Sequence, residues 1–228
     1  MRLLSALTLL LFLAVPAAAQ TAERLPWFAV DLHGAWVGLP SAEGWVPVVP
    51  ANTPLPGRGW GVAVGATVYP LKLGPVTIGL GGGLATGKGT SSALKETTGT
   101  GPTETTKATT TTVTTQITSM VPQLSLNFGH RLGWSYLSAG YGRHKVASSS
   151  APFGTIAAVT VPELWEGAIS FGGGARWFMK PRLGAGFDVR FTRLGSRATA
   201  TTATPVATTT AAPGRTRVIT LSVGISIQ

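Results

Sequence analysis

The ionisable residues that could do chemistry fall into two groups. The first group lies in the middle of strongly patterned apolar segments and comprises Asp31, His33, Arg176, Asp188 and Arg190. A charge in such surroundings must be paired to be tolerated, so we expect a structural cluster of ion pairs. Arg176 and Asp188 flank one short turn, and we expect these two residues to be coupled. A gate in a narrow channel is the alternative that the same residues allow.

The second group surrounds a histidine. His144 lies between Arg143 and Lys145, three serines follow at positions 148–150, and Glu166 opens a later segment. A serine, a histidine and a carboxylate are the parts of a hydrolytic triad, which is recognised by geometry and not by chain order. We favour another interpretation, in which Arg143, His144, Lys145 and Glu166 form an outer rim whose basic groups contact lipid phosphates.

Motifs for other chemistry are absent from the chain. There is no zinc-ligand spacing, no Walker motif and no cysteine. The stretch GLGGGLATGKGT resembles a phosphate loop, but its glycines follow the alternation of a strand and no helix follows it. We therefore expect no catalytic residues, no metal and no cofactor, and a protein that is not an enzyme.

The elements that position these residues are strands, because apolar and small or polar residues alternate with a period of two. Eight segments show this alternation: residues 28–36, 60–68, 76–86, 122–129, 135–142, 165–177, 185–192 and 218–228. Three connections are short, at 70–75, 129–133 and 180–184. Four are long, at 39–59, 87–115, 146–163 and 194–216. Short turns at one end and long loops at the other are typical of outer-membrane barrels.

The two faces of each strand indicate which side meets lipid. One face carries Val, Ile, Leu, Phe and Trp, whereas the other carries mostly Gly, Ser, Thr and Ala, with hardly any Lys or Glu. Aromatic residues gather near both ends of the strands, as membrane interfaces favour. Because no water is available in hydrocarbon, the strands must close completely. We therefore expect segment 218–228 to pair with segment 28–36, with small side chains in the bore.

The remaining composition bounds the location and the partners. Residues 1–19 have a positive start, an apolar stretch and an Ala-Ala-Ala end, which predicts a cleaved signal peptide before a domain at 20–228. The Thr-rich tracts within 97–115 and 198–214 are of low complexity, and the Thr runs could extend the strands beyond the membrane. The formal net charge is +10, yet only 11% of residues are charged and the basic ones are scattered. This pattern favours anionic lipid over nucleic acid as the partner.

The stretch LWEGAISFGGGARWFMKPRLGAGFDVRFTRLG combines a Gly-rich strand, an aromatic pair, a Pro-Arg-Leu-Gly turn and a strand with Asp and Arg on its small-residue face. On this stretch, and more loosely on RLGWSYLSAGYG, the chain resembles the small bacterial outer-membrane β-barrel proteins of the OmpA-like and OmpX-like kind over residues 27–228. The resemblance implies an all-β, eight-stranded antiparallel up-and-down transmembrane barrel in the outer membrane.

For function, we expect a non-enzymatic role as a structural or surface-interaction protein. A narrow passive channel, or transport of a small apolar ligand, is the alternative, and a lipid A hydrolase is the third possibility. The expected partners are outer-membrane lipid and lipopolysaccharide, with an extracellular ligand possible through the long loops and a monomer as the expected state.

Overall fold

A computed structural model describes residues 25–41, 45–46, 54–97, 107–152, 158–161, 163–195 and 216–228. The predicted signal peptide at 1–19 and the Thr-rich tract at 198–214 lie outside the described residues. Nine strands are present in the described part: β1 (Phe28–Gly38), β2 (Arg58–Leu73), β3 (Val76–Thr97), β4 (Lys107–His130), β5 (Gly133–Ser150), β6 (Val159–Val161), β7 (Trp165–Phe178), β8 (Leu183–Leu194) and β9 (Arg217–Ile227).

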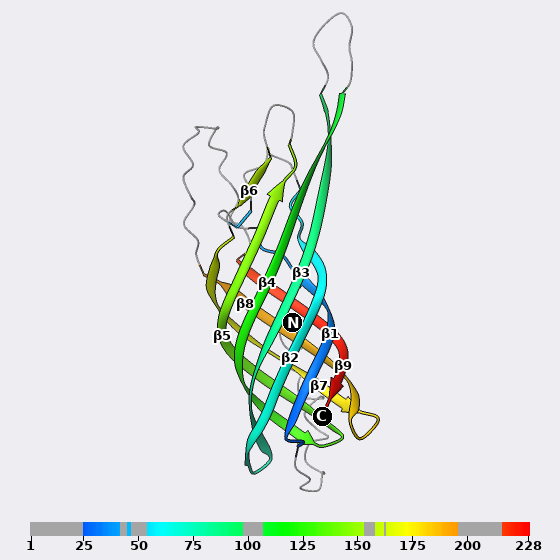
Figure 1. The fold of residues 1–228 in the computed structure, drawn as a ribbon, viewed down its shortest axis with the longest axis vertical. Helices are drawn as coiled ribbons and strands as arrows, with labels where there is room; N and C mark the ends of the chain where they lie inside the picture. The colour runs from blue at the N-terminus through cyan, green and yellow to red at the C-terminus, as the bar shows by residue number, and fades with distance from the viewer. Residues whose placement is uncertain are drawn as a thin grey trace, which may run out of the picture.

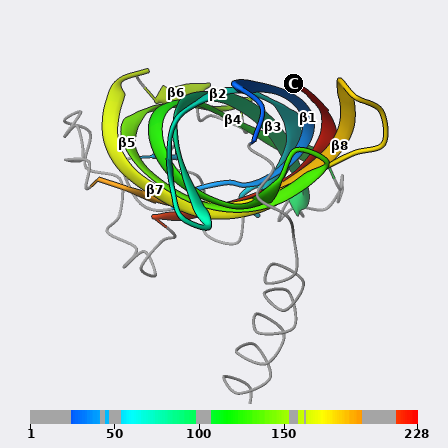
Figure 2. The same ribbon diagram turned by 90° about the horizontal axis from the view of Figure 1, so that it is seen from below.

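Eight of these strands close into a ring. Each pairs antiparallel with its neighbours in the order β1, β2, β3, β4, β5, β7, β8, β9, and β9 pairs back onto β1. The view along the axis shows the closed ring (Figure 2). The short β6 pairs only with the end of β5. The expected eight-stranded up-and-down barrel is therefore confirmed, with one small strand added at its rim.

The last strand has no free edge, because it forms the seam of the barrel. Leu32 of β1 lies opposite Ile225 of β9, and eight such pairs run from Val30–Ile227 to Val37–Thr220. An open edge in hydrocarbon would leave backbone groups without hydrogen bonds, and this seam removes that cost.

The connections differ at the two ends as the sequence predicts (Figure 1). At one end the turns contain only residues 74–75, 131–132 and 179–182, and Gly74 takes a positive φ of 60° in the first. At the other end, β3 and β4 pair continuously from Val76–Phe128 to Thr97–Lys107. The expected loop at 87–115 is therefore wrong for most of its length. The expectation that the Thr run extends the strands is confirmed.

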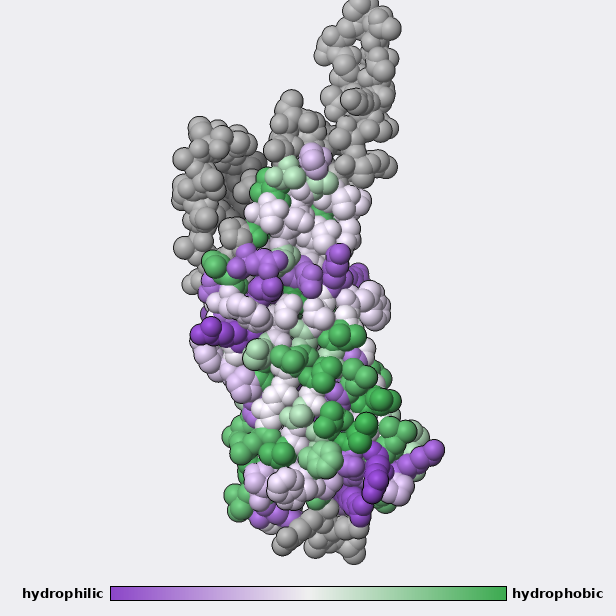
Figure 3. Space-filling view, viewed as in Figure 1, coloured by the Kyte–Doolittle hydropathy of each residue, from purple (hydrophilic) through white to green (hydrophobic). Residues whose placement is uncertain are grey.

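The apolar face of the strands points outward. Leu32, Val64, Leu84, Leu137 and Ile169 are all exposed on the outside. The surface shows a band of apolar residues between polar ones (Figure 3). This is the distribution that lipid around the middle of a barrel requires. The described residues contain no helix long and apolar enough to cross a membrane.

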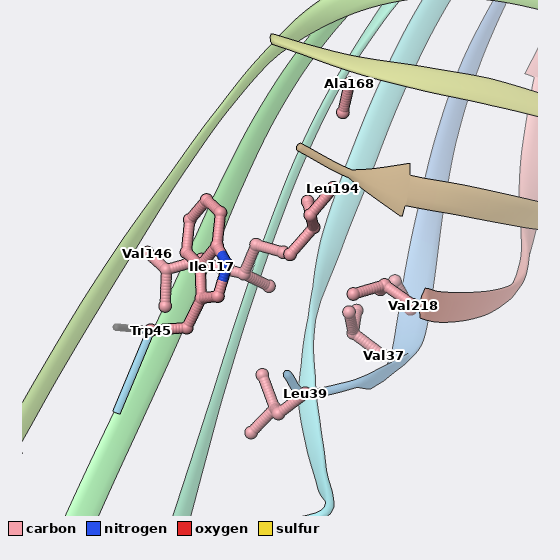
Figure 4. Packing of buried hydrophobic residues seen from close by; sticks show 9 residues of the cluster. Val37, Leu39, Trp45, Ile117, Val146, Ala168, Leu194 and Val218 are labelled. Carbon is pink, nitrogen blue, oxygen red and sulfur yellow. The ribbon is translucent and has the colours of Figure 1, made fainter. Parts of the chain in front are cut away.

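The sequence predicts a bore lined by small and polar residues, and this prediction is wrong in part, because large apolar residues also line it. A first apolar cluster lies at the long-loop end and contains Ala35, Val37, Leu39, Trp45, Ile117, Val146, Ala168, Leu194 and Val218 (Figure 4). A second lies at the short-turn end and contains Ala29, Tyr69, Trp134, Tyr136 and Phe178. Apolar clusters therefore lie toward both ends of the bore, and the polar residues lie between them.

Candidate functional site in the bore

The central feature of the bore is a buried ion pair between Asp31 and Arg176. Arg176 Nη2 lies 2.5 Å from Asp31 Oδ2, and Arg176 Nε lies 2.8 Å from Asp31 Oδ1, so the guanidinium donates two parallel hydrogen bonds. Ser226 donates a third hydrogen bond to Asp31 Oδ1 at 2.6 Å. β1, β7 and β9 each place one of these residues on the inner face, so the pair ties β7 to the seam strands across the bore.

Aromatic rings form the surroundings of Arg176 on the side of the short turns. The guanidinium carbon lies 4.4 Å from the ring centre of Tyr136 and 5.7 Å from that of Trp134. Nη1 also donates to the Tyr69 hydroxyl at 3.4 Å. Trp134 in turn stacks on Phe178 with their ring centres 5.0 Å apart. Cation–π contacts in a water-poor site stabilise the charge, so these rings add to the stabilisation that Asp31 gives Arg176.

The second pair of predicted charges, Asp188 and Arg190, lies on β8, and both side chains also bond to residues of β5. Arg190 donates from Nη2 and Nε to the Asp188 carboxylate at 3.2 and 3.3 Å. Tyr136 donates its hydroxyl hydrogen to Asp188 at 2.8 Å. The direct partner of Arg176 is thus Asp31, and among the described residues no ion pair joins Arg176 to Asp188. Tyr136 contacts both and so connects them.

A polar chamber of about 80 Å³ lies between the ion pairs and the long-loop cluster. Its walls include Asp31, Arg190, His33 and His144. His33 Nδ1 lies 3.1 Å from the Ser222 hydroxyl, whereas its Nε2 has no hydrogen-bond partner in the described part of the protein. Arg190 Nη1 is also without one. A polar space of this size has room for several water molecules, which suits such groups.

The predicted outer rim is divided by the alternation of β5. Arg143 is exposed on the outside, and Lys145 is half-buried and forms a salt bridge with Glu163 at 2.6 Å. His144 points the other way and is only 2% exposed, so placing it in a lipid-contacting rim was wrong. Glu166 lies directly opposite His144 in the register of β5 and β7 and is half-buried on the inner face. The period of two itself could have separated His144 from its neighbours, because exposed Tyr141 fixes which residues face out.

The possible Ser-His-Glu triad is not connected by hydrogen bonds in the described residues, although Glu166 lies opposite His144 in the sheet. Both ring nitrogens of His144 lack a hydrogen-bond partner among the described residues. The hydroxyl of Ser148 instead contacts that of Thr115 at 2.8 Å. A general base must reach the nucleophile that it activates, and here neither serine nor glutamate bonds to the histidine. The described residues also contain no group of three or more His, Asp or Glu side chains that could hold a metal ion.

Two features of the bore were missed by sequence reasoning. Trp45 lies in the connection between β1 and β2, where no periodic pattern marks it, yet it is 1% exposed within the long-loop cluster (Figure 4). Trp134 is the second residue of β5 and lies at an inner position next to a turn. Its spacing of two from Tyr136, which the alternation places inside, is the signal that could have found it.

Comparison with known proteins supports the fold and no more than the fold. No protein-family model matches the chain, and no curated protein matches it. Among solved structures, Neisserial surface protein A matches with a TM-score of 0.50 and 11% identity, over 89% of this chain and 97% of the other. Ail, the attachment invasion locus protein of Yersinia pestis, gives 0.46 and 10%, over 88% and 95%. The outer membrane protease OmpT of Escherichia coli gives 0.44 and 7%, over 75% and 64%. The expected resemblance to outer-membrane β-barrel proteins is confirmed at the level of the fold.

Proposed function

We propose that this chain is an integral outer-membrane barrel with a closed bore and a non-enzymatic, structural or surface-interaction role. The observation that carries the proposal is the filling of the bore. The aromatic cluster with Trp134, the Asp31–Arg176 ion pair and the cluster with Trp45 follow one another along the axis. Ions cannot pass apolar contacts of this kind without dehydration, which costs several kcal/mol.

The proposed location follows from the sequence and the outer surface. The predicted signal peptide supports export, and the apolar band supports insertion in the outer membrane. In this setting the short turns face the periplasm and the long connections, including the β3–β4 hairpin, face outward. The surface role would then belong to those connections, which could contact an extracellular ligand, while lipopolysaccharide surrounds a monomeric barrel.

Transport through a narrow channel is the second candidate. The polar chamber of about 80 Å³ favours it, because a conducting path needs such a space. Trp45 belongs to a connection and not to a strand, and displacement of its side chain would thin the apolar cluster at the long-loop end. A lipid A hydrolase is the weaker third candidate, because the geometry around His144 provides no activated nucleophile.

Conductance of the purified protein in planar lipid bilayers tests the proposal. We expect no discrete channel events from the wild type, and none from Trp165→Ala, in which a Trp on the outer surface is removed. Trp45→Ala thins the cluster at the long-loop end. We expect no channel events from this variant either, because the ion pair still blocks the bore. Discrete events in the wild type would overturn the closed bore and establish the channel.

A second measurement addresses the enzyme. The protein is incubated with lipid A, and the release of ester-linked acyl chains is followed by mass spectrometry. We expect no release. Release by the wild type that His144→Ala abolishes would establish the hydrolase instead.

A further inference from the structure

Three exposed arginines lie on the outer surface near the long-loop end of the barrel, on strands β5, β8 and β9, with β7 between β5 and β8. Arg193 of β8 and Arg217 of β9 lie directly opposite each other in the sheet, and both are exposed. Like charges in directly opposed positions repel each other and destabilise a sheet. The arrangement is therefore unfavourable for the protein alone and calls for an anion between the two side chains.

Arg143 of β5 is the third arginine; it lies across β7 from Arg193, in the next outward-facing row toward the long-loop end. It lies opposite Gly167 of β7, whose carbonyl oxygen accepts a hydrogen bond at 3.3 Å from the amide of Gly195, two residues after Arg193 in the chain. Gly167 has no side chain of its own. The hydroxyl of Tyr141 lies over this glycine, so closely that a Cβ there would overlap it. We call Arg143, Arg193 and Arg217 the arginine patch.

The arginine patch has no counter-charge in the described protein. Lys145, its basic neighbour, is neutralised by Glu163 at 2.6 Å. The other ion pairs of the described residues use Asp31 and Asp188, which lie on the inner face of the barrel. Glu166 also lies on the inner face, with the strand backbone between it and the patch. Three positive charges are thus presented outward together with one phenolic hydroxyl.

The rows of the sheet next to the patch show what kind of anion fits. One row across the sheet contains Arg217 of β9, Arg193 of β8 and Ile169 of β7, which lie opposite one another in that order. Two residues nearer the middle of the barrel, a row of exposed apolar side chains follows: Ile219, Phe191 and Phe171, with the two phenyl rings stacked 5.5 Å apart. Arginine above and apolar surface below match a molecule with a charged head and acyl chains.

We infer that the arginine patch binds the phosphate of a lipid headgroup in the outer leaflet, as lipopolysaccharide presents it. Guanidinium groups bind phosphate through paired hydrogen bonds, and the Tyr141 hydroxyl adds a further donor. The acyl chains lie against Ile219, Phe191 and Phe171. The inference rests on the outer-membrane placement proposed above and gives the lipid partner a defined site.

Binding of lipid A to the purified barrel in a zwitterionic detergent tests the site, with native mass spectrometry as the readout. The probes are bis-phosphorylated lipid A, the same lipid without its phosphates, and inorganic phosphate alone. The test variant is Arg143→Gln/Arg193→Gln/Arg217→Gln. The matched control, Arg131→Gln/Lys180→Gln/Arg182→Gln, removes three exposed basic residues at the short-turn end.

We expect the test variant to bind phosphorylated lipid A at least about tenfold more weakly than the wild type, and the control variant to bind as the wild type does. Lipid without phosphate should bind the wild type as weakly as phosphorylated lipid binds the test variant. Equal weakening in both variants would overturn the site in favour of unspecific charge attraction. If inorganic phosphate alone bound the wild type as strongly as phosphorylated lipid A does, the lipid would be overturned as the ligand.

A second readout does not depend on lipid. In phosphate-free detergent, Arg193→Gln should unfold at the same or a slightly higher temperature than the wild type, because the repulsion with Arg217 is removed. A marked loss of stability would show that Arg193 has a structural partner and would contradict the proposal. Channel conductance is measured separately, so failure of the lipid site and failure of the closed-bore proposal are distinguished.

Discussion

Asp31 and Arg176 are 145 residues apart in the chain, yet they form the best-connected polar contact of the bore. Each side chain is almost completely buried, and the carboxylate accepts three hydrogen bonds. A pair of this kind contributes little compared with an apolar replacement, but loss of one partner leaves a charge without compensation. The two residues therefore have to be considered as a unit.

The stability losses of the two single variants of the ion pair should add up to more than the loss of the double variant. We expect Asp31→Asn and Arg176→Met each to lower the free energy of unfolding by about 3–5 kcal/mol. The double variant should lose less than the sum of the two, by about 1–3 kcal/mol. Urea unfolding in lipid vesicles measures all three. Additive losses would show that the pair does not act as a unit, and the same cycle on Arg176 and Asp188 should give a smaller coupling.

The residue scale also shows what a single sequence reveals. Alternation placed Asp31, His33, Arg176, Asp188 and Arg190 inside, and all five line the bore or its chamber. It could not assign Arg176 to Asp31, because the tilt and register of the closed barrel decide which heights meet across the bore. Trp45 was beyond reach for another reason: a loop residue has no period, and only the packing of the finished barrel buries it.

At the scale of the strands, closure depends on how closely the seam strands approach each other. Gly224 of β9 lies opposite His33 of β1 and points into the bore. A Cβ at this position would overlap the carbonyl oxygen of Leu32 and lie 2.6 Å from the His33 Cα. Gly34, on the outer face of the same seam, is different, since a Cβ there would meet only the Val223 carbonyl oxygen at 3.9 Å. The seam thus contains its own matched pair of positions.

Gly224→Ala should therefore destabilise the barrel, whereas Gly34→Ala should not. Because the added methyl group must displace backbone, we expect Gly224→Ala to cost about 1–3 kcal/mol. Gly34→Ala should remain within about 0.5 kcal/mol of the wild type. The temperature at which each variant loses its compact, fast-migrating form in SDS gels gives the comparison. Equal behaviour of the two variants would contradict the close approach at the seam.

For the whole molecule, the two surfaces of the barrel reverse the usual order of a soluble protein. Large apolar side chains face outward, and the bore contains ion pairs and hydroxyl groups between two apolar clusters. Such a surface is stable only where lipid or detergent replaces water. The sequence predicted the outer surface well because each strand repeats the same pattern. It did not predict the apolar clusters at the two ends of the bore, which depend on a few residues near strand ends and in one loop.

The outward face of the barrel makes a depth-dependent prediction. Val64 of β2 lies on the outside at mid-height, between Leu32 of β1 and Leu84 of β3. Val64→Arg places a charge in the middle of the lipid, and we expect it to lower the free energy of unfolding in vesicles by about 2–4 kcal/mol. Thr90→Arg, also on an outer face but in the part of β3 beyond Lys88, should cost about 0–1 kcal/mol.

The comparison of these two variants separates lipid contact from solvent contact. Both substitutions add the same charge to an exposed position of a strand, so backbone and charge effects alone would make their costs similar. Only burial of Val64 in hydrocarbon makes Val64→Arg the more costly one. Equal costs in lipid vesicles, or a purified protein that stays monomeric in water without detergent, would show that the apolar band does not face a membrane.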